Sequence, residues 1–241
     1  MRIALLYIYT LLSYLILYPF TAINVLIILL LHTLGFKKVI PVIIRLWART
    51  SFLIIAKFFK VEGIENLNPD QKYILMANHS SLFDVVGIMA IYPNIAWFGR
   101  ANLMEIPVFG KLLKVINYIP MKSTDLKNAK YMIEQLIQST ENQTVAIFPE
   151  GTRTTDGKLN NFRKGFLHVL KASKLDILPV SLVGFYEFKP KTRFYFDYSQ
   201  KLSAKIHQPI TYQELEYLDD KDIIQQVHTQ IESALVKSYD K

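Results

Sequence analysis

The apolar residues of the chain gather first in one long run near the N-terminus. Residues 3–36 contain no Asp, Glu, Lys or Arg, and Ile, Leu, Tyr and Val dominate from Ile3 to Leu31. A helix needs ~20 such residues to cross the hydrocarbon core of a bilayer. A cleaved signal peptide would be shorter, and the core helix of a soluble protein rarely stays apolar for so long. We therefore expect this region to associate with a membrane.

Two arrangements of this run are open. A single straight helix over the whole run would be ~51 Å long, against a hydrocarbon core of ~30 Å. Pro19 lies near the middle, so either one tilted, kinked helix crosses the bilayer or two shorter helices dip into one leaflet and return. Arg2 at one end and Lys37-Lys38 at the other place positive charge at both ends, which favours the dip.

The next apolar stretch, residues 39–59, has an amphipathic pattern. It carries Arg45, Arg49 and Lys57, with Trp47 between the two arginines. This pattern is typical of a helix that lies in the membrane interface, where its basic side chains meet anionic headgroups. The positive charge at this end also places the part of the chain that follows on the cytoplasmic side of the membrane.

From about Lys60 the pattern changes to short β-rich runs that alternate with helical periodicity. Strands are predicted at 73–77, 144–148, 177–183 and 194–198, and helices at 82–92, 165–172, 220–237 and around the apolar face Leu126, Met132, Ile133, Leu136 and Ile137. This alternation predicts an α/β domain with a mostly parallel mixed sheet flanked by helices. We divide the chain into an N-terminal membrane region, 1–59, and this domain, 60–241, which ends in the C-terminal helix.

Composition narrows the possible partners. The net charge of +8 points to an anionic partner, and the apolar N-terminus favours lipid over nucleic acid, for which the chain has no motif. The absence of cysteine excludes disulfides and thiolate nucleophiles. The five histidines are scattered, with no pair at metal-ligand spacing, so we predict no metal and no cofactor. They are His32, His79, His168, His207 and His228.

A polar cluster, Asn78–Asp84, stands between two strongly apolar runs. His79 follows a predicted strand and Asp84 falls in the first turn of a predicted helix, so both lie at the carboxyl edge of the sheet, where α/β proteins bind ligands. A turn between them lets the carboxylate meet the imidazole, which then serves as a general base. Two other readings stay open. Ser81–Asp84 also matches a helix-capping box, and Ser80 or Ser81 would be the nucleophile of a hydrolase.

A second cluster, Phe148–Arg153, follows another predicted strand. Pro149 and Gly151 on either side of the glutamate predict a tight turn that exposes Glu150 and Arg153. Taken alone, this hexapeptide fits an ordinary polar turn with a surface ion pair.

The two clusters together, NHSSLFD ending at Asp84 and FPEGTR beginning at Phe148, resemble the glycerolipid acyltransferases with the His-x-x-x-x-Asp motif. The resemblance is strongest to the bacterial 1-acylglycerol-3-phosphate O-acyltransferases and covers roughly residues 60–212. Other stretches that fit are Gly99-Arg100, Leu103, Ile106–Gly110, Asn117–Lys122, Phe162–Gly165 and Leu178–Val180.

The resemblance implies transfer of a fatty acyl group from acyl-CoA or acyl carrier protein to the free hydroxyl of a lysophospholipid, foremost 1-acylglycerol-3-phosphate, to give phosphatidic acid. His79 would deprotonate this hydroxyl and Asp84 would orient the imidazole. Glu150, Gly151, Thr152 and Arg153 would bind the glycerol-phosphate end of the acceptor. It also implies a bacterial inner membrane location, with the catalytic domain on the cytoplasmic face.

The chain departs from the family pattern at three positions. It has Lys122 where the second motif usually ends in Arg, and Arg100 and Asn102 where Lys and an acidic residue are common. Arg100 and Lys122 remain candidate phosphate ligands. The departures keep a different lysophospholipid acceptor open, beside a membrane thioesterase or lipase and a non-enzymatic lipid-binding protein.

Basic residues with few acidic neighbours also gather between positions 158 and 193. They are Lys158, Arg163, Lys164, Lys171, Lys174, Lys189, Lys191 and Arg193. A solvated face is the ordinary explanation of such a group. With a membrane region in the same chain, we expect part of it to contact anionic lipid or an acidic carrier protein.

Overall fold

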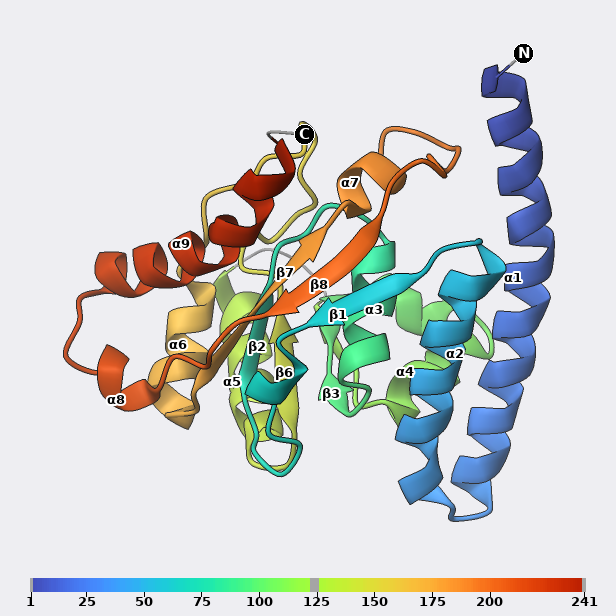
Figure 1. Ribbon diagram of the computed structural model, residues 1–241. Helices are drawn as coiled ribbons and strands as arrows, with labels where there is room; N and C mark the ends of the chain where they lie inside the picture. Colours follow the sequence, from blue (N-terminus) through green and yellow to red (C-terminus); the bar gives the residue numbers. More distant parts are fainter. Residues whose placement is uncertain (1, 122–125, 240–241) are drawn as a thin grey trace.

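The computed structural model describes residues 2–121 and 126–239. Its longest element is helix α1, Arg2–Thr33, which lies along one side of the molecule in Figure 1. A 3-10 turn, Lys37–Val39, leads into helix α2, Ile40–Ile54, which returns beside α1. Among the helices of these residues, α1 alone is long and apolar enough to cross a membrane.

Helix α1 continues through Pro19, so the predicted pair of shorter helices is wrong. A proline removes one N–H group from the helical ladder, whereas each additional helix end leaves several backbone groups without partners. In apolar surroundings those extra unpaired groups cost more than the single missing bond. The crossing of a bilayer by α1 stays a prediction.

Helix α2 has the predicted amphipathic pattern. Its buried residues recur every three or four positions, and Arg45 and Arg49 are exposed. Lys57, however, is only 6% exposed, which corrects its expected place among lipid headgroups. Its ammonium donates to the carbonyl oxygens of Tyr198, at 2.5 Å, and Gln200, at 2.6 Å. Lys57 thus ties the end of α2 to the α/β domain.

Six strands form the central sheet, in the order β1-β8-β7-β2-β6-β3. Their bounds are Phe59–Glu62 (β1), Ile74–Ala77 (β2), Ile95–Ala96 (β3), Thr144–Ile147 (β6), Ile177–Val183 (β7) and Leu202–Ile206 (β8). All neighbouring pairs are parallel except β7 and β8, which are antiparallel. This arrangement confirms the expected α/β fold with a mostly parallel mixed sheet.

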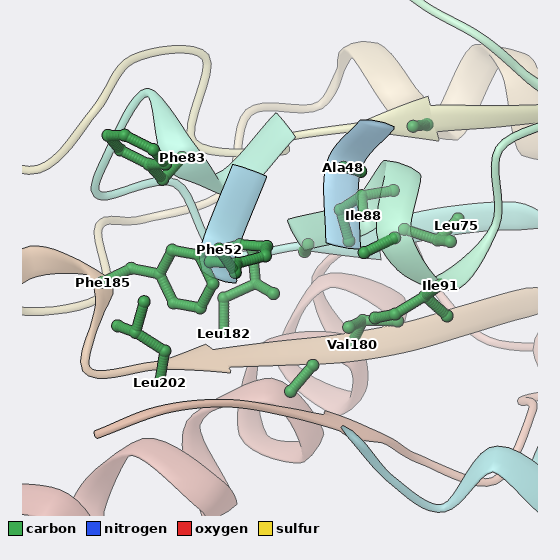
Figure 2. Packing of buried hydrophobic residues seen from close by; sticks show 14 of the residues in the cluster. Ala48, Phe52, Leu75, Phe83, Ile88, Ile91, Val180, Leu182, Phe185 and Leu202 are labelled. Atoms are coloured by element: carbon green, nitrogen blue, oxygen red, sulfur yellow. The ribbon is translucent and has the colours of Figure 1, made fainter. Parts of the chain in front are cut away.

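Alternate residues of the strands face opposite sides of the sheet. In β2, Leu75 and Ala77 belong to one core cluster, while Ile74 and Met76 belong to another. The first cluster lies against α2 and α3, and Figure 2 shows Phe52 of α2 within it. The second lies against α5, α6 and α9. Because helices cover both faces of the sheet, a substrate can reach the sheet only at its edges, where the central strands end in polar residues.

The bounds of these helices are Phe83–Ile91 (α3), Leu126–Thr140 (α5), Gly165–Ser173 (α6) and Asp220–Tyr239 (α9). The other helices are short: α4 (Phe109–Val115), α7 (Phe185–Phe188), α8 (Tyr212–Leu215) and the 3-10 helices Ile64–Asn66 and Ala101–Glu105. Strands β4 (Phe98–Arg100) and β5 (Ile119–Met121) form a separate parallel pair.

The strand predicted at 194–198 is wrong, because these residues belong to the irregular connection between α7 and β8. Its aromatic side chains, which suggested a strand, pack against helix α1 instead. Phe196 lies 5.0 Å from Tyr14 between ring centroids, and Tyr195 lies 5.2 Å from Tyr7. The strand that does follow, β8, was not predicted.

Candidate active site

The two polar motifs meet at one edge of the sheet. Strands β2 and β6 are parallel neighbours, and their register pairs Met76 with Ile147. The first motif begins at Asn78, two residues after Met76, and the second at Phe148, one residue after Ile147. Both motifs therefore leave the sheet at the same edge. The predicted position of His79 and Asp84 at the carboxyl edge is thus where these residues lie.

Asp84 is fully buried at the start of α3 and holds the histidine. Its Oδ2 atom lies 2.9 Å from Nδ1 of His79 and accepts the backbone N–H groups of Ser80, at 2.6 Å, and Ser81, at 2.7 Å. A carboxylate accepts hydrogen bonds, so Nδ1 carries the proton and the lone pair is at Nε2. This tautomer suits a general base.

The imidazole plane is fixed by an aromatic neighbour from the second motif. The ring of Phe148 stacks on His79 with a centroid distance of 4.0 Å and an interplanar angle of 14°. Trp97 continues the stack on Phe148 at 5.8 Å. The histidine is therefore held both at Nδ1 and across its face, which restricts where Nε2 can point.

The predicted capping box is only half present. The Asp84 carboxylate accepts from Ser81 N, as a box requires, but the Ser81 hydroxyl donates to the carbonyl of Lys189, at 2.7 Å. The residue before α3 is Leu82, which makes no side-chain cap. The Ser81 oxygen accepts the backbone N–H of Phe83, at 3.3 Å, instead of the N–H of Asp84 that a box requires. A complete box occurs elsewhere, between Thr211 and Glu214.

Neither serine of the motif forms a hydrogen bond with the imidazole. Ser80 Oγ donates to Asp84 Oδ1 at 3.4 Å and Ser81 Oγ to Lys189, and both serines are buried. The geometry thus lacks the serine–histidine hydrogen bond of a hydrolase nucleophile.

Glu150 is 3% exposed, so the turn does not expose it as predicted. Its Oε1 atom accepts the backbone N–H of His79, at 2.5 Å, and its Oε2 atom accepts the backbone and side-chain amides of Asn160, at 2.9 and 2.8 Å. Burial raises the pKa of the Glu150 carboxyl, and the N–H donors oppose this shift. Glu150 therefore braces the backbone of His79. Asn160, which the sequence did not single out, completes the brace.

The rest of the second motif surrounds the same turn. Gly151 has φ +70°, and a Cβ atom there would come within 2.8 Å of Arg163 Nε. Thr152 is exposed. The backbone N–H of Thr154 donates to the carbonyl of His79 at 2.9 Å. The backbone N–H of His79 is thus held by the second motif, and its carbonyl by the residue that directly follows that motif.

Arg153 is half-buried and, in the part of the chain that the structure describes, forms no ion pair. Two further cations of the predicted basic group, Lys189 and Arg193, lie close by. Burial and the charges of Arg153 and Arg193 lower the pKa of Lys189. This concentration of positive charge beside the two motifs suits an anionic ligand.

Two more basic residues lie at this turn, since Arg163 lies against Gly151 and the Lys191 ammonium donates to the carbonyl of Arg153 at 3.3 Å. The other basic candidates lie elsewhere. Lys171 pairs with Asp220 at 2.6 Å, away from the turn. Arg100 ends β4, and Lys122 lies outside the described residues. Over residues 2–121 and 126–239, no three histidine or acidic side chains gather as a metal site would require. Phosphate binding by Arg100 or Lys122 and a metal-free mechanism stay predictions.

Comparison with known proteins agrees with this geometry. The Acyltransferase family model matches residues 58–183. A chloroplastic 1-acyl-sn-glycerol-3-phosphate acyltransferase from Arabidopsis thaliana is 28% identical over 146 residues, which cover 59% of this chain and 40% of that protein. The matched region thus spans about two fifths of this relative's length. A 1-acyl-sn-glycerol-3-phosphate acyltransferase from Helicobacter pylori is 27% identical over 75% of this chain and 82% of its own.

The crystal structure of a 1-acyl-sn-glycerophosphate acyltransferase from Thermotoga maritima has the same fold. It superimposes with a TM-score of 0.85 at 25% sequence identity, and the match covers 100% of this chain and 99% of that one. The likeness therefore includes α1 and α2 as well as the α/β domain. With the family model matching more than half of its 241 residues and both motifs meeting at one sheet edge, the chain belongs to the acyltransferase family.

Proposed function

We propose that this protein transfers a fatty acyl group from an acyl thioester to the free hydroxyl of 1-acylglycerol-3-phosphate, which gives phosphatidic acid. The observation that carries the proposal is the His79–Asp84 pair, with Nδ1 held at 2.9 Å by a buried carboxylate. The acceptor is inferred from the names of the relatives, which act on 1-acyl-sn-glycerol-3-phosphate.

In the proposed reaction, Nε2 of His79 takes the proton of the acceptor hydroxyl while its oxygen attacks the thioester carbonyl carbon. The tetrahedral intermediate then collapses, the carbon–sulfur bond breaks, and the leaving thiolate takes the proton from the imidazolium. Asp84 stabilises the imidazolium between these steps. The acyl group passes directly to the acceptor, so the protein needs no covalent acyl intermediate.

The phosphate of the acceptor would bind at Arg153. Its guanidinium has no carboxylate partner among the described residues, and a guanidinium can bind a phosphate through two parallel hydrogen bonds. The nearby charge of Lys189 would add attraction. Gly151 and Thr152 share the turn and would contact the glycerol, while Glu150 would act through the backbone of His79 rather than on the substrate.

The membrane would supply the acceptor. Helix α1 leaves large apolar side chains exposed along its length, among them Leu15 at 70%. We place the protein in a bacterial inner membrane with the domain of residues 60–241 on the cytoplasmic face. There the donor would be acyl-CoA or acyl carrier protein, and exposed lysines such as Lys158 would meet anionic lipid or an acidic carrier.

The test is a panel assay. Purified protein would receive labelled acyl-CoA or acyl carrier protein together with lysophospholipids of different headgroups. We expect the highest kcat/KM with 1-acylglycerol-3-phosphate. Replacement Arg153→Ala should raise the KM for this acceptor about tenfold or more, because a charge-assisted hydrogen bond is lost. Lys221→Ala, at an exposed lysine of α9 to which no binding role is given, is the control and should leave KM unchanged.

Three outcomes would contradict the proposal. Equal use of every headgroup would contradict the acceptor. Release of free fatty acid without any acceptor would indicate a thioesterase or lipase. Binding of lysophospholipid with no product from any donor would indicate a non-enzymatic lipid-binding protein.

A further inference from the structure

Two polar side chains are buried in helix α1 among exposed apolar ones. Thr10 is 0% exposed and Ser13 is also buried, whereas the neighbouring Leu11 and Leu12 are 55% and 50% exposed. A membrane anchor needs no buried hydroxyl groups facing the protein. These two side chains therefore require another explanation.

Both hydroxyl groups bind residues 189–198, a part of the connection between α7 and β8 that we call the strap. The Thr10 hydroxyl donates to Leu6 O within the helix and accepts the backbone N–H of Phe196, at 2.9 Å. The Ser13 hydroxyl lies 2.8 Å from the Tyr198 hydroxyl. Figure 1 shows the strap reaching from α7 toward α1. One end of the strap is thus attached to the membrane helix.

The other end of the strap is attached to the catalytic turn, residues 79–84. The Ser81 hydroxyl donates to Lys189 O at 2.7 Å, and Ser81 and Pro190 form an isolated antiparallel bridge. The backbone N–H of Ser81 in turn donates to the Asp84 carboxylate. Movement at the start of the strap would therefore move a donor of Asp84.

The end of the strap that binds α1 also contacts the same turn through one ring. Phe196 is fully buried, and its ring centroid lies 5.0 Å from Tyr14 of α1 and 5.4 Å from Phe83. Phe83 directly precedes Asp84 at the start of α3. A continuous chain of packed groups thus runs from α1 through Phe196 to the residue next to the catalytic carboxylate.

We propose that α1 positions the catalytic turn through the strap, and that Thr10 is a positioning residue for acyl transfer. The inference rests on the proposed function, because it concerns the same His79–Asp84 pair. Thr10 fixes the backbone of Phe196, Phe196 supports Phe83, and Lys189 holds Ser81. The membrane helix is then a part of the active site's framework as well as an anchor.

The direct test is Thr10→Val, which keeps the shape of the side chain but leaves the buried N–H of Phe196 without its acceptor. We expect kcat to fall about tenfold, since the turn is held less firmly. The KM for acceptor and donor should stay within about twofold, because no substrate contact is lost. The amount of protein in the membrane fraction should not change.

Two variants separate this positioning role from general damage to α1. Thr10→Ser retains the hydroxyl oxygen and should restore kcat to near the wild-type value. Thr33→Val is the matched control, since Thr33 is exposed on the same helix and bonds only Leu30 O. It should have wild-type kcat. A wild-type kcat in Thr10→Val, or a Thr10→Ser variant as slow as Thr10→Val, would overturn the proposal.

A double-mutant cycle tests whether the strap is the connection. Ser81→Ala removes the bond at the other end of the strap, together with the bond that the Ser81 oxygen accepts from the N–H of Phe83, and Ser81 and Thr10 share no hydrogen bond. If the strap links them, the double variant should be little slower than the slower single variant. If the two losses multiply instead, the effect of Thr10 does not pass through the Lys189–Ser81 end of the strap, and that part of the proposal is wrong.

Two outcomes need separate treatment. Should Thr10→Val fail to accumulate in the membrane, Ser13→Ala carries the same test, with a reduced kcat in support and an unchanged one against. Wild-type protein that forms no product would contradict the proposed function itself. Active wild-type protein with an equally active Thr10→Val variant would contradict only the role of the strap.

Discussion

Asp84 has no lysine or arginine partner within ion-pair distance among the described residues; its carboxylate is held by three hydrogen-bond donors within 2.9 Å. Two of these donors are backbone N–H groups of the turn, and the third is Nδ1 of His79. The carboxylate therefore fixes both the turn and the tautomer of the histidine. Its position at the start of α3 also lets the helix dipole favour the negative charge.

Replacement Asp84→Asn should keep the shape of this side chain and destroy its effect. The new amide can donate to Nδ1, which would move the ring proton to Nε2, where the lone pair is needed. We expect kcat to fall by about a thousandfold or more, as such a tautomer change does in other histidine-based sites. Initial rates at saturating substrates would measure it, and Ser80→Ala, which loses only the bond of 3.4 Å, is the control. A kcat within tenfold of wild type would contradict the role of Asp84.

Replacement Glu150→Gln separates two roles for the second motif. If Glu150 braces His79, an amide nitrogen placed against the N–H groups of His79 or Asn160 should lower the melting temperature and kcat, with little change in KM. If the carboxylate instead binds the acceptor, KM should rise while the melting temperature stays the same. The kinetic constants and the melting temperature of the purified variant decide between the two.

The sequence was sufficient to predict that His79 and Asp84 lie together, because motif residues at strand ends converge on one sheet edge, where the turn around Glu150 also lies. It did not predict the hydrogen bond from Asn160 to Glu150, the stacking of Phe148 on His79 or the contacts of the strap. Asn160 lies in an irregular segment without periodicity, and its bond to Glu150 depends on how that segment folds back. The burial of Glu150 also depends on tertiary packing, which a Pro-Glu-Gly sequence does not reveal.

At the scale of elements, the sheet and α9 are joined by a buried polar contact. Ser181 of β7 donates to Ile231 O of α9 at 2.6 Å and lies 2.8 Å from Nε2 of His207, which directly follows β8. Because the Ser181 hydroxyl donates its proton to the carbonyl of Ile231, its oxygen accepts the Nε2–H group of a neutral His207 imidazole. This contact fixes three elements to one another on the face away from α1.

The same contact predicts a loss of stability in mild acid. Burial, with a contribution from Lys205, lowers the pKa of His207 from 6.5 to about 4. Between these values the unfolded chain binds the proton and the folded one does not, so stability falls as the pH drops from 6.5 toward 4. We expect about 2 kcal/mol less stability at pH 5 than at pH 7 from this group. Thermal unfolding at the two pH values should show it, and His207→Gln should reduce the difference.

The prediction of elements failed where side chains pack on something other than the sheet. The aromatic run at 194–198 has the composition of a strand, yet its rings face helix α1, which lies more than 180 residues away in the sequence. Pro19 likewise suggested a helix end that apolar surroundings suppress. Both errors arise from tertiary contacts or from the surroundings of the chain, which a local sequence pattern does not contain.

The prediction for His207 has its own contradicting outcome. If the stability of His207→Gln depends on pH as strongly as that of the wild type, His207 is not the group that lowers stability in mild acid.

At the scale of the whole molecule, the chain combines a long apolar helix with an α/β domain whose candidate active site lies at the sheet edge. The sequence predicted the long apolar helix and the mostly parallel α/β fold, because a long apolar run and an alternation of strand and helix patterns are strong local signals. It did not predict how the two parts interact. Residues of α2 such as Phe52 share a core with α3 and the sheet, as Figure 2 shows, so the division at residue 59 stays a proposal.

The central claim is that His79 activates the hydroxyl of a lysophospholipid held at the membrane surface. The most direct measurement is the transfer of a labelled acyl group from acyl-CoA to 1-acylglycerol-3-phosphate by membranes that contain equal amounts of wild-type protein or His79→Ala. We predict labelled phosphatidic acid from the wild type and none above background from the variant, with both proteins retained in the membrane. Phosphatidic acid formed by His79→Ala at a rate near that of the wild type would contradict the claim.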